Sequence, residues 1–293
     1  MSAQGHPMTR ARALVALHVA ALCFGATGVI GAWLALPAAE ITEGRCVVAA
    51  LTLAVVLRRR GERLVVSRAL VFNGLLLAAH WTAFFAAVEA GGVAVGALGY
   101  ASFPLFVVLL ERALAGRALD RASMATVALV FAGLATMALP GVAVEGLVPG
   151  LALGVLSGAS FAWLSVRVRL IVGTLPPVAL ALGQCVFAAL WLAPLTMLAA
   201  GWRAPTPGEW AGIAILGVVC TALAHTLFIG AMRIVSAHTA SVVVALEPVY
   251  AIVLAAALLR QVPGAATLAG GALIVAAAFV ATRRRDAPVP LPG

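Results

Sequence analysis

The sequence predicts an all-α integral membrane protein with ten transmembrane helices, arranged as two inverted five-helix repeats. Three observations support this fold class. Of the 293 residues, 64% are hydrophobic and only 10% are charged, apolar runs of membrane-spanning length recur along the chain, and the second half repeats the pattern of the first. A soluble domain would have about a quarter of its residues charged, so the composition excludes a soluble globular protein.

Ten apolar segments follow one another with short connections between them. A spanning helix needs about 20 mostly apolar residues. Cutting the chain at charged and Pro/Gly-rich breaks predicts helices at 13–34, 41–57, 69–89, 93–112, 122–140, 147–166, 177–199, 209–231, 236–259 and 264–282. The first segment follows two arginines and is longer than a signal-peptide core, so we expect it to be retained.

The arginines predict how these helices are oriented. The chain has nineteen arginines and no lysine, and sixteen of the arginines fall in the connections on one side, five of them between residues 58 and 68. The other side has only Arg45, Arg203 and Arg260. Because cytoplasmic loops carry the excess of basic residues, both terminal segments, 1–12 and 283–293, are expected in the cytoplasm. The net charge of +9 is explained by this orientation, so no nucleic-acid partner is expected.

An internal repeat accounts for the order of the helices. Shifting the chain by 144 residues places 84–106 over 228–250 and aligns Pro104 with Pro248. The predicted repeats are 13–140 and 147–282. Because each repeat contains five helices, the second must enter the membrane from the opposite side. Inverted repeats are typical of secondary transporters, which bind their substrate near the midplane between the halves.

Several motifs carry a family resemblance. The stretches FGATGVIGAWLALP, ASFPLF and TASVVVALEPVYAIVLAAALL, together with Arg45 in the second helix, resemble the EamA-type carriers of the drug/metabolite transporter superfamily, and within it the YddG-like exporters of aromatic amino acids. The resemblance implies export of amino acids or similar small metabolites through a cavity surrounded by helices 1, 3, 4, 6, 8 and 9. One departure is that Gly116-Arg117 and Arg260-Gln261 replace the Gly-Glu pairs that commonly end the fourth and ninth helices of the family.

The Glu247-Pro248 pair lies near the middle of the ninth segment. A charged side chain at the bilayer centre costs about 2.5–3.5 kcal/mol, so the carboxyl of Glu247 must face protein or a wet cavity. Two interpretations remain open. Glu247 contacts a substrate or a coupling ion, or it is protonated and hydrogen-bonds a neighbouring helix.

Aromatic and imidazole side chains supply the other candidates. His80 and Phe84 share one face of the third helix, and His225 occupies the eighth helix at the position that matches Trp81 under the 144-residue shift. A hydroxyl on the fourth helix and an indole on the sixth complete the predicted substrate-binding set, which is His80, Phe84, Tyr100, Trp163, His225 and Glu247. For each histidine a structural hydrogen bond is the alternative, and for Trp163 the alternative is core packing.

Other functions and partners are less well supported. The four cysteines lack metal-ligand spacing, and no metal or other cofactor is expected. The expected partners are a small-molecule substrate and the lipid bilayer, and a homodimer through the small residues of 122–140 and 264–282 is compatible with their composition.

The arginine-rich, lysine-free composition favours the inner membrane of a bacterium with a GC-rich genome. We expect no enzymatic activity. A lipid flippase and an intramembrane serine protease using Ser160 and His225 are the alternatives.

Overall fold

A computed structural model describes residues 8–115, 120–138, 146–199, 203–259 and 264–283, and the regular structure in these ranges is helical throughout. In chain order the elements are α1 (Arg10–Trp33), α2 (Ala38–Arg59), α3 (Arg68–Tyr100), α4 (Phe103–Ala115), α5 (Arg121–Ala138), α6 (Leu147–Ile171), α7 (Pro177–Met197), α8 (Pro207–Gly217), the π-helical turn η2 (Val218–Leu223), α9 (Ala224–Ala231), α10 (Ala237–Val244), α11 (Glu247–Leu259) and α12 (Ala265–Arg283). The sequence interpretations of 116–117 and 260–261 concern residues outside these ranges.

Among the described residues, seven helical segments are long and apolar enough to cross a membrane. They are Arg10–Trp33, Arg68–Val93, Val95–Leu114, Leu147–Ile171, Pro177–Met197, Pro207–Ala231 and Ala237–Leu254. The apolar parts of α5 and α12 are shorter, and α2 carries charged residues at both of its ends as well as Arg45. The all-helical, multi-pass architecture is therefore confirmed, while the count of ten spanning helices stays a prediction.

The boundary between the third and fourth predicted helices is a sharp reversal of the chain. Gly92, inside α3, has φ 80° and ψ 169°, a left-handed conformation that glycine adopts without the steric cost of a Cβ. Gly96 lies against the preceding arm, where an added Cβ would sit 3.3 Å from the backbone nitrogen of Val88. The two glycines therefore allow the arms on either side of the turn to pack closely.

Two of the predicted spanning helices are each interrupted by a two-residue break, at 101–102 and at 245–246. The 144-residue shift relates the two breaks. Pro104 and Pro248 lie two residues after them, and neither can donate a hydrogen bond to the carbonyl four residues earlier. The next backbone bonds are also equivalent, since residue 106 donates to 102 at 3.1 Å and residue 250 donates to 246 at 3.0 Å. The two halves thus share a proline-associated interruption.

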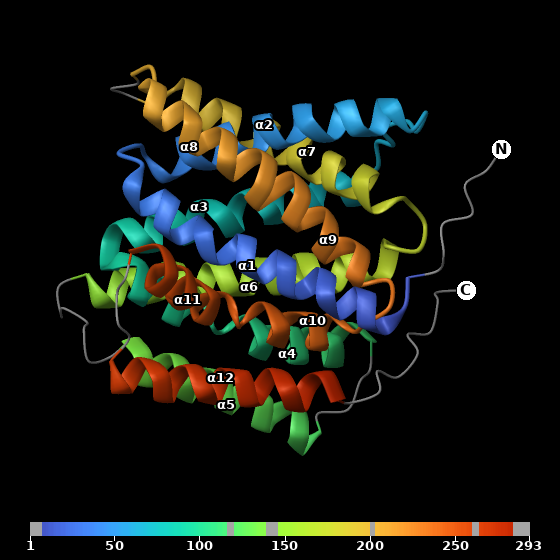
Figure 1. Ribbon diagram of the computed structural model, residues 1–293. Helices are drawn as coiled ribbons and strands as arrows, with labels where there is room; N and C mark the ends of the chain where they lie inside the picture. The colour runs from blue at the N-terminus through green and yellow to red at the C-terminus, as the bar shows by residue number, and fades with distance from the viewer. Residues whose placement is uncertain (1–7, 116–119, 139–145, 200–202, 260–263, 284–293) are drawn as a thin grey trace.

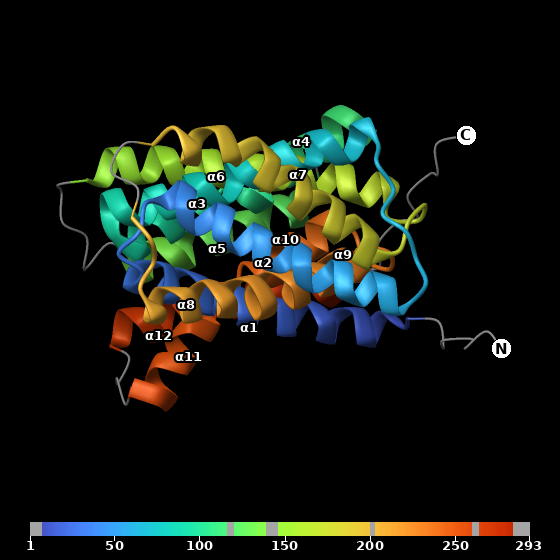
Figure 2. The same cartoon turned by 90° about the horizontal axis from the view of Figure 1, so that it is seen from above.

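The helices form a bundle with a clear inside and outside (Figure 1). α1, α3, α6 and α9 run through its middle, α2, α7 and α8 cover one side, and α5 and α12 lie side by side on the other. Figure 2 shows α11 projecting from the edge of the bundle at one end. Arg10 donates a hydrogen bond to the carbonyl of Thr282 at 3.0 Å, so α1 begins and α12 ends at the same end of the bundle.

Small residues bring α5 and α12 together within the chain. A Cβ on Gly133 would lie 2.6 Å from the carbonyl oxygen of Gly270, so the two backbones are in close contact. The small-residue faces that suggested a homodimer are therefore used against each other, and a dimer through these helices stays a prediction.

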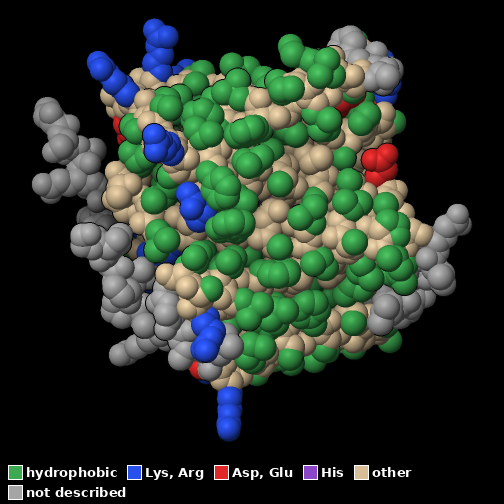
Figure 3. Space-filling view, turned by 180° about the vertical axis from the view of Figure 1, so that it is seen from behind, with side chains coloured by type: hydrophobic (Ala, Val, Ile, Leu, Met, Phe, Trp, Pro, Cys, Tyr) green, Lys and Arg blue, Asp and Glu red, His purple; other side chains and the backbone are tan. Residues whose placement is uncertain are grey.

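The surface matches the apolar composition. Figure 3 shows hydrophobic side chains spread over much of one face, with most of its visible arginines toward one edge of the view and a prominent acidic side chain at the opposite edge. Large apolar side chains such as Val15, Leu51 and Phe279 are more than half exposed, which suits contact with lipid rather than water.

Candidate functional site

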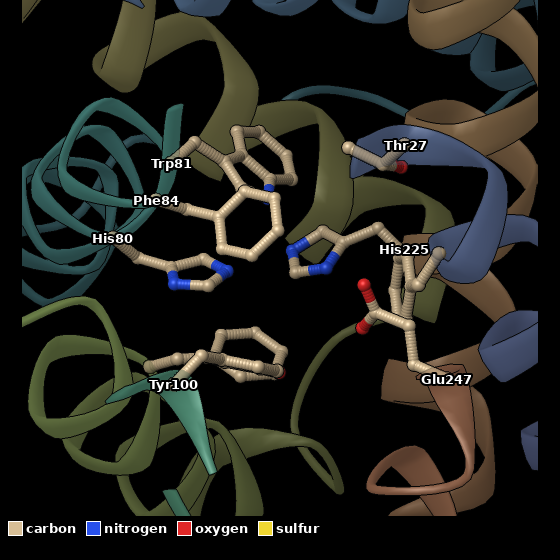
Figure 4. A pocket seen from close by; sticks show the side chains of 9 residues that line it. Thr27, His80, Trp81, Phe84, Tyr100, His225 and Glu247 are labelled. Carbon is tan, nitrogen blue, oxygen red and sulfur yellow. The ribbon is translucent and has the colours of Figure 1, made fainter. Parts of the chain in front are cut away.

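A small cavity lies within the bundle between helices of both halves (Figure 4). α1 and α3 supply its wall from the first half, and α6, α9 and α11 from the second. Nine residues line it: Phe24, Thr27, His80, Trp81, Phe84, Tyr100, Phe161, His225 and Glu247. The space open to the centre of a water molecule is about 20 Å³, which is room for one or two waters. A larger ligand requires the walls to move apart.

The structure brings five of the six predicted residues to this cavity: His80, Phe84, Tyr100, His225 and Glu247. Trp163 lies elsewhere. Its side chain is 42% exposed and its ring packs edge-on against Phe72 at 5.4 Å. Trp163 lies on α6 one turn before Arg167, and its face of the helix points away from the cavity. Residue spacing along the sequence predicted the position of Trp163 along its helix, but not the direction in which its side chain faces.

Residues related by the internal repeat meet at the cavity. Trp81 and His225, which the 144-residue shift superimposes, contact each other with ring centroids 5.8 Å apart. Phe84 lines the cavity, and its equivalent, Phe228, stacks on Phe161 at 5.2 Å behind the wall. The cavity therefore forms where equivalent positions of the two halves come together.

The two histidines are held by hydrogen bonds to neighbouring helices. His80 Nδ1 lies 2.8 Å from the hydroxyl of Ser157 and 3.1 Å from its carbonyl oxygen, and His225 Nε2 lies 2.7 Å from Gln184 Oε1. A carbonyl oxygen accepts, whereas a hydroxyl donates or accepts, so the tautomer of each ring decides whether its other nitrogen is a donor or an acceptor. His225 Nδ1 is buried and has no partner among the described residues. Figure 4 shows the two rings facing each other across the cavity.

Glu247 supplies the carboxyl group of the cavity wall. It is the first residue of α11, directly after the break at 245–246. A carboxylate in the first turn of a helix is stabilised by the helix dipole. Its carboxyl makes no hydrogen bond or ion pair with the described residues and points into the cavity. The group is therefore free to bind a proton, a cation or a ligand ammonium.

Arg45 is a second residue whose surroundings the sequence did not predict. Its sequence position is near the outer end of the helix expected at 41–57, on the side opposite the cytoplasm. The helix begins at Ala38 instead, so Arg45 lies about 10 Å along it, and its side chain is fully buried at 0% exposure. The guanidinium stacks on Trp81, 4.1 Å from the ring centroid.

The π-helical turn η2 supplies the hydrogen bonds of Arg45. Arg45 Nε donates to Thr221 Oγ1 at 2.8 Å, and Nη2 donates to the carbonyl of Cys220 at 3.2 Å. π-turns inside helices are frequent at functional sites because they displace a backbone group from its usual partner. The sequence carried no signal for this turn, since Val218–Leu223 looks like ordinary apolar helix.

Two phenylalanines separate the central cavity from a second, larger one. This cavity, about 570 Å³, is formed by the end of α1, the start of α2 and part of α3, and Phe85 and Glu89 are in its wall. Phe84 and Phe85 pack against each other at 5.8 Å. Glycines of α1 make room for them, since a Cβ on Gly31 would overlap the ring of Phe85. The phenylalanine pair is therefore the barrier between the two spaces.

The proposed protease pair is not assembled. The hydroxyl of Ser160 donates to the carbonyl of Leu156 at 2.8 Å, and His225 is bonded to Gln184. Ser160 is therefore not paired with His225, and the serine that contacts a cavity histidine is Ser157, whose hydroxyl lies 2.8 Å from His80 Nδ1.

Comparisons with known proteins identify the family and the fold. The sequence matches the EamA-like transporter family over residues 11–139 and again over 148–283. No curated protein matches the chain. One solved structure, described only as a crystal structure of a protein, is similar with a TM-score of 0.81 and 22% identity, over 94% of this chain and 99% of that one. At this identity the similarity shows the fold alone. The two family matches span most of the sequence, and the chain belongs to the EamA-like transporter family, membrane transporters of the drug/metabolite type.

Proposed function

We propose that this protein is a bacterial inner-membrane exporter of amino acids, aromatic or neutral, that works by alternating access between two inverted five-helix repeats. The observation that carries the proposal is the central cavity, which has aromatic walls, two imidazoles and one carboxyl group that makes no hydrogen bond with the described residues. An aromatic wall suits an apolar side chain, and an acidic group with acceptors suits an ammonium. His80, Phe84, Tyr100, His225 and Glu247 are the proposed substrate-binding residues.

The size of the cavity supports a closed stage of the transport cycle. A cavity with room for one or two waters does not hold an amino acid, so the walls must separate for binding. The barrier of Phe84 and Phe85 toward the larger cavity is only one side-chain layer thick, and the breaks at 101–102 and 245–246 are places where helices can bend. Movement of these elements would open the central cavity to one side.

The proposal is tested with purified protein in liposomes. Labelled phenylalanine should enter vesicles preloaded with unlabelled phenylalanine, saturably and in competition with other neutral amino acids. Phe84→Ala should reduce this exchange because it removes a ring of the cavity wall. Trp163→Ala is the matched control, since it removes an aromatic ring outside the cavity, and it should leave exchange unchanged. Absence of saturable exchange for every amino acid tested would overturn the proposal.

A lipid flippase and a serine protease are not favoured by any particular contact. A flippase would expose lipid probes on the opposite leaflet without solute exchange in the same vesicles. Peptide cleavage abolished by Ser160→Ala would indicate a protease.

A further inference from the structure

Arg45 carries a permanent charge with no carboxylate in direct contact among the described residues, and the acidic group that interacts with it at a distance is Glu247. A guanidinium stays protonated in proteins, and burying it without an acidic partner is costly. Arg45 has two hydrogen bonds and a ring stack, but no carboxylate pairs with it among the described residues. Its Nη1 is buried and makes no hydrogen bond there. Because buried polar groups are nearly always paired, this unused donor points to a function beyond packing.

The position of Arg45 relates it to the cavity. One face of the Trp81 ring is in contact with the guanidinium at 4.1 Å, and the same ring forms part of the cavity wall. Figure 4 shows Trp81 on one side of the cavity and Glu247 on the other. The cavity therefore has a negative group in its wall at one side and a positive group behind its wall at the other.

A further unpaired polar atom lies at the same cavity. His225 Nδ1 is buried without a partner among the described residues, and His225 lines the cavity. The carboxyl group of Glu247 can accept hydrogen bonds from a ligand ammonium, and the positive charge of Arg45 behind Trp81 attracts an anionic group. A ligand that uses both features carries an ammonium at one end and an anionic group at the other.

We propose that Arg45 is a specificity-determining residue, whose buried charge makes the cavity select ligands that carry a carboxylate together with an ammonium. This rests on the proposed function and assigns the two ends of the substrate, with the ammonium toward Glu247 and the carboxylate toward Trp81. Arg45 acts as a positioning residue, because Trp81 stands between it and the cavity and its charge acts through a poorly screened interior. Without Arg45 the remaining carboxylate would favour simple organic cations.

The test compares ligands that differ only at the carboxylate. Purified protein in detergent is titrated with phenylalanine and with phenylalaninamide, and thermal stabilisation gives the affinity of each, since ligands that bind the native state stabilise it. Wild type should bind phenylalanine more tightly than the amide. Arg45→Met, which keeps the length of the side chain but not its charge, should reverse or abolish that preference, a change of roughly tenfold in the affinity ratio.

Two control variants separate charge selection from a structural role. Arg45→Lys keeps the charge and should retain the preference for phenylalanine. Arg167→Met removes another arginine that stacks on a ring, 4.7 Å from Phe72, and hydrogen-bonds a side chain, Asn73, yet does not line the cavity. It should leave the ratio unchanged. A purely structural role for Arg45 would lower both affinities equally.

The outcomes distinguish the inference from the function on which it rests. An unchanged ratio in Arg45→Met, with binding intact, would overturn the role of Arg45 and leave the exporter proposal standing. If Arg45→Met does not fold, wild type and Arg45→Lys still decide the matter, because tighter binding of the amide by either protein contradicts the inference. Failure of every amino acid to stabilise wild type would overturn both proposals.

Discussion

Of the residues in the cavity wall, Glu247 is the one with a carboxylate, and its unpaired state makes a direct prediction. Glu247→Gln keeps the shape of the side chain and removes its charge. Because no ion pair with the described residues is lost, and a neutral amide is less costly to bury than a carboxylate, folding should be preserved. Exchange of phenylalanine per folded molecule should fall roughly tenfold, equivalent to about 1.4 kcal/mol of lost interaction.

The amount of folded protein is measured by size-exclusion chromatography, and the exchange of phenylalanine is measured in liposomes. Glu209→Gln is the control, because Glu209 pairs with Arg203 at 2.6 Å at the start of α8, outside the cavity, and glutamine can still take part in the capping box with Thr206. Exchange equal to wild type in Glu247→Gln would mean that Glu247 has a structural role only.

At the same scale, the sequence predicted the depth of side chains better than their direction. Glu247, His80 and His225 were found because ionisable groups in apolar segments are rare and visible. Trp163 was placed in the binding set by depth, but the rotation of α6 turns it outward. Arg45 was missed because its burial depends on contacts with Trp81 of α3 and with Thr221 and Cys220 of η2, which the sequence of α2 does not contain. Helix rotation and boundaries depend on packing against neighbours, which one helix's sequence does not contain.

At the scale of elements, α11, which follows the break at 245–246, is in close backbone contact with α1. A Cβ added at Gly25 would lie 2.7 Å from the carbonyl oxygen of Glu247 and 3.2 Å from the nitrogen of Ala251, and neither backbone atom can rotate away. Gly25→Ala should therefore push α11 from α1 and destabilise the protein by about 1–3 kcal/mol. Phenylalanine exchange should also fall, because Glu247 moves with the backbone.

Thermal unfolding in detergent checks this expectation. Gly173→Ala is the control, since nothing lies within 4 Å of the added Cβ, and its midpoint should match wild type or exceed it. A Gly25→Ala protein with the stability and exchange of wild type would show that α1 and α11 do not need their close contact.

The breaks themselves were only partly predictable. The sequence indicated a shared proline at 104 and 248 and suggested that both belong to the architecture. The two-residue interruptions before them were not expected, because propensity alone predicts a bend at a proline rather than a stop. The π-helical turn in the eighth predicted helix was not expected either. Its carbonyl of Cys220 accepts a hydrogen bond from Arg45, which lies on another helix, so the sequence of the turn alone does not reveal it.

At the scale of the whole molecule, the arrangement of arginines predicts which end of the bundle faces the cytoplasm. The structure places the start of α1 and the end of α12 at one end of the bundle through the Arg10–Thr282 bond. The charge asymmetry of the connections predicts that this end faces the cytoplasm. The asymmetry is large, with sixteen of nineteen arginines on one side. This feature could be read from sequence because it depends on counts in the connections and not on packing.

Labelling of cysteines introduced one at a time, in intact cells, tests the orientation of the protein in the membrane. In a background with Cys23→Ala, which removes the one partly exposed native cysteine while the three buried ones remain, exposed positions are replaced at the two ends as Arg60→Cys and Ala204→Cys. A membrane-impermeant maleimide should label Ala204→Cys in intact cells, because the segment before α8 is expected outside. Arg60→Cys should react only after permeabilisation. The opposite pattern would place the arginine-rich end outside and would reverse the proposed direction of every helix.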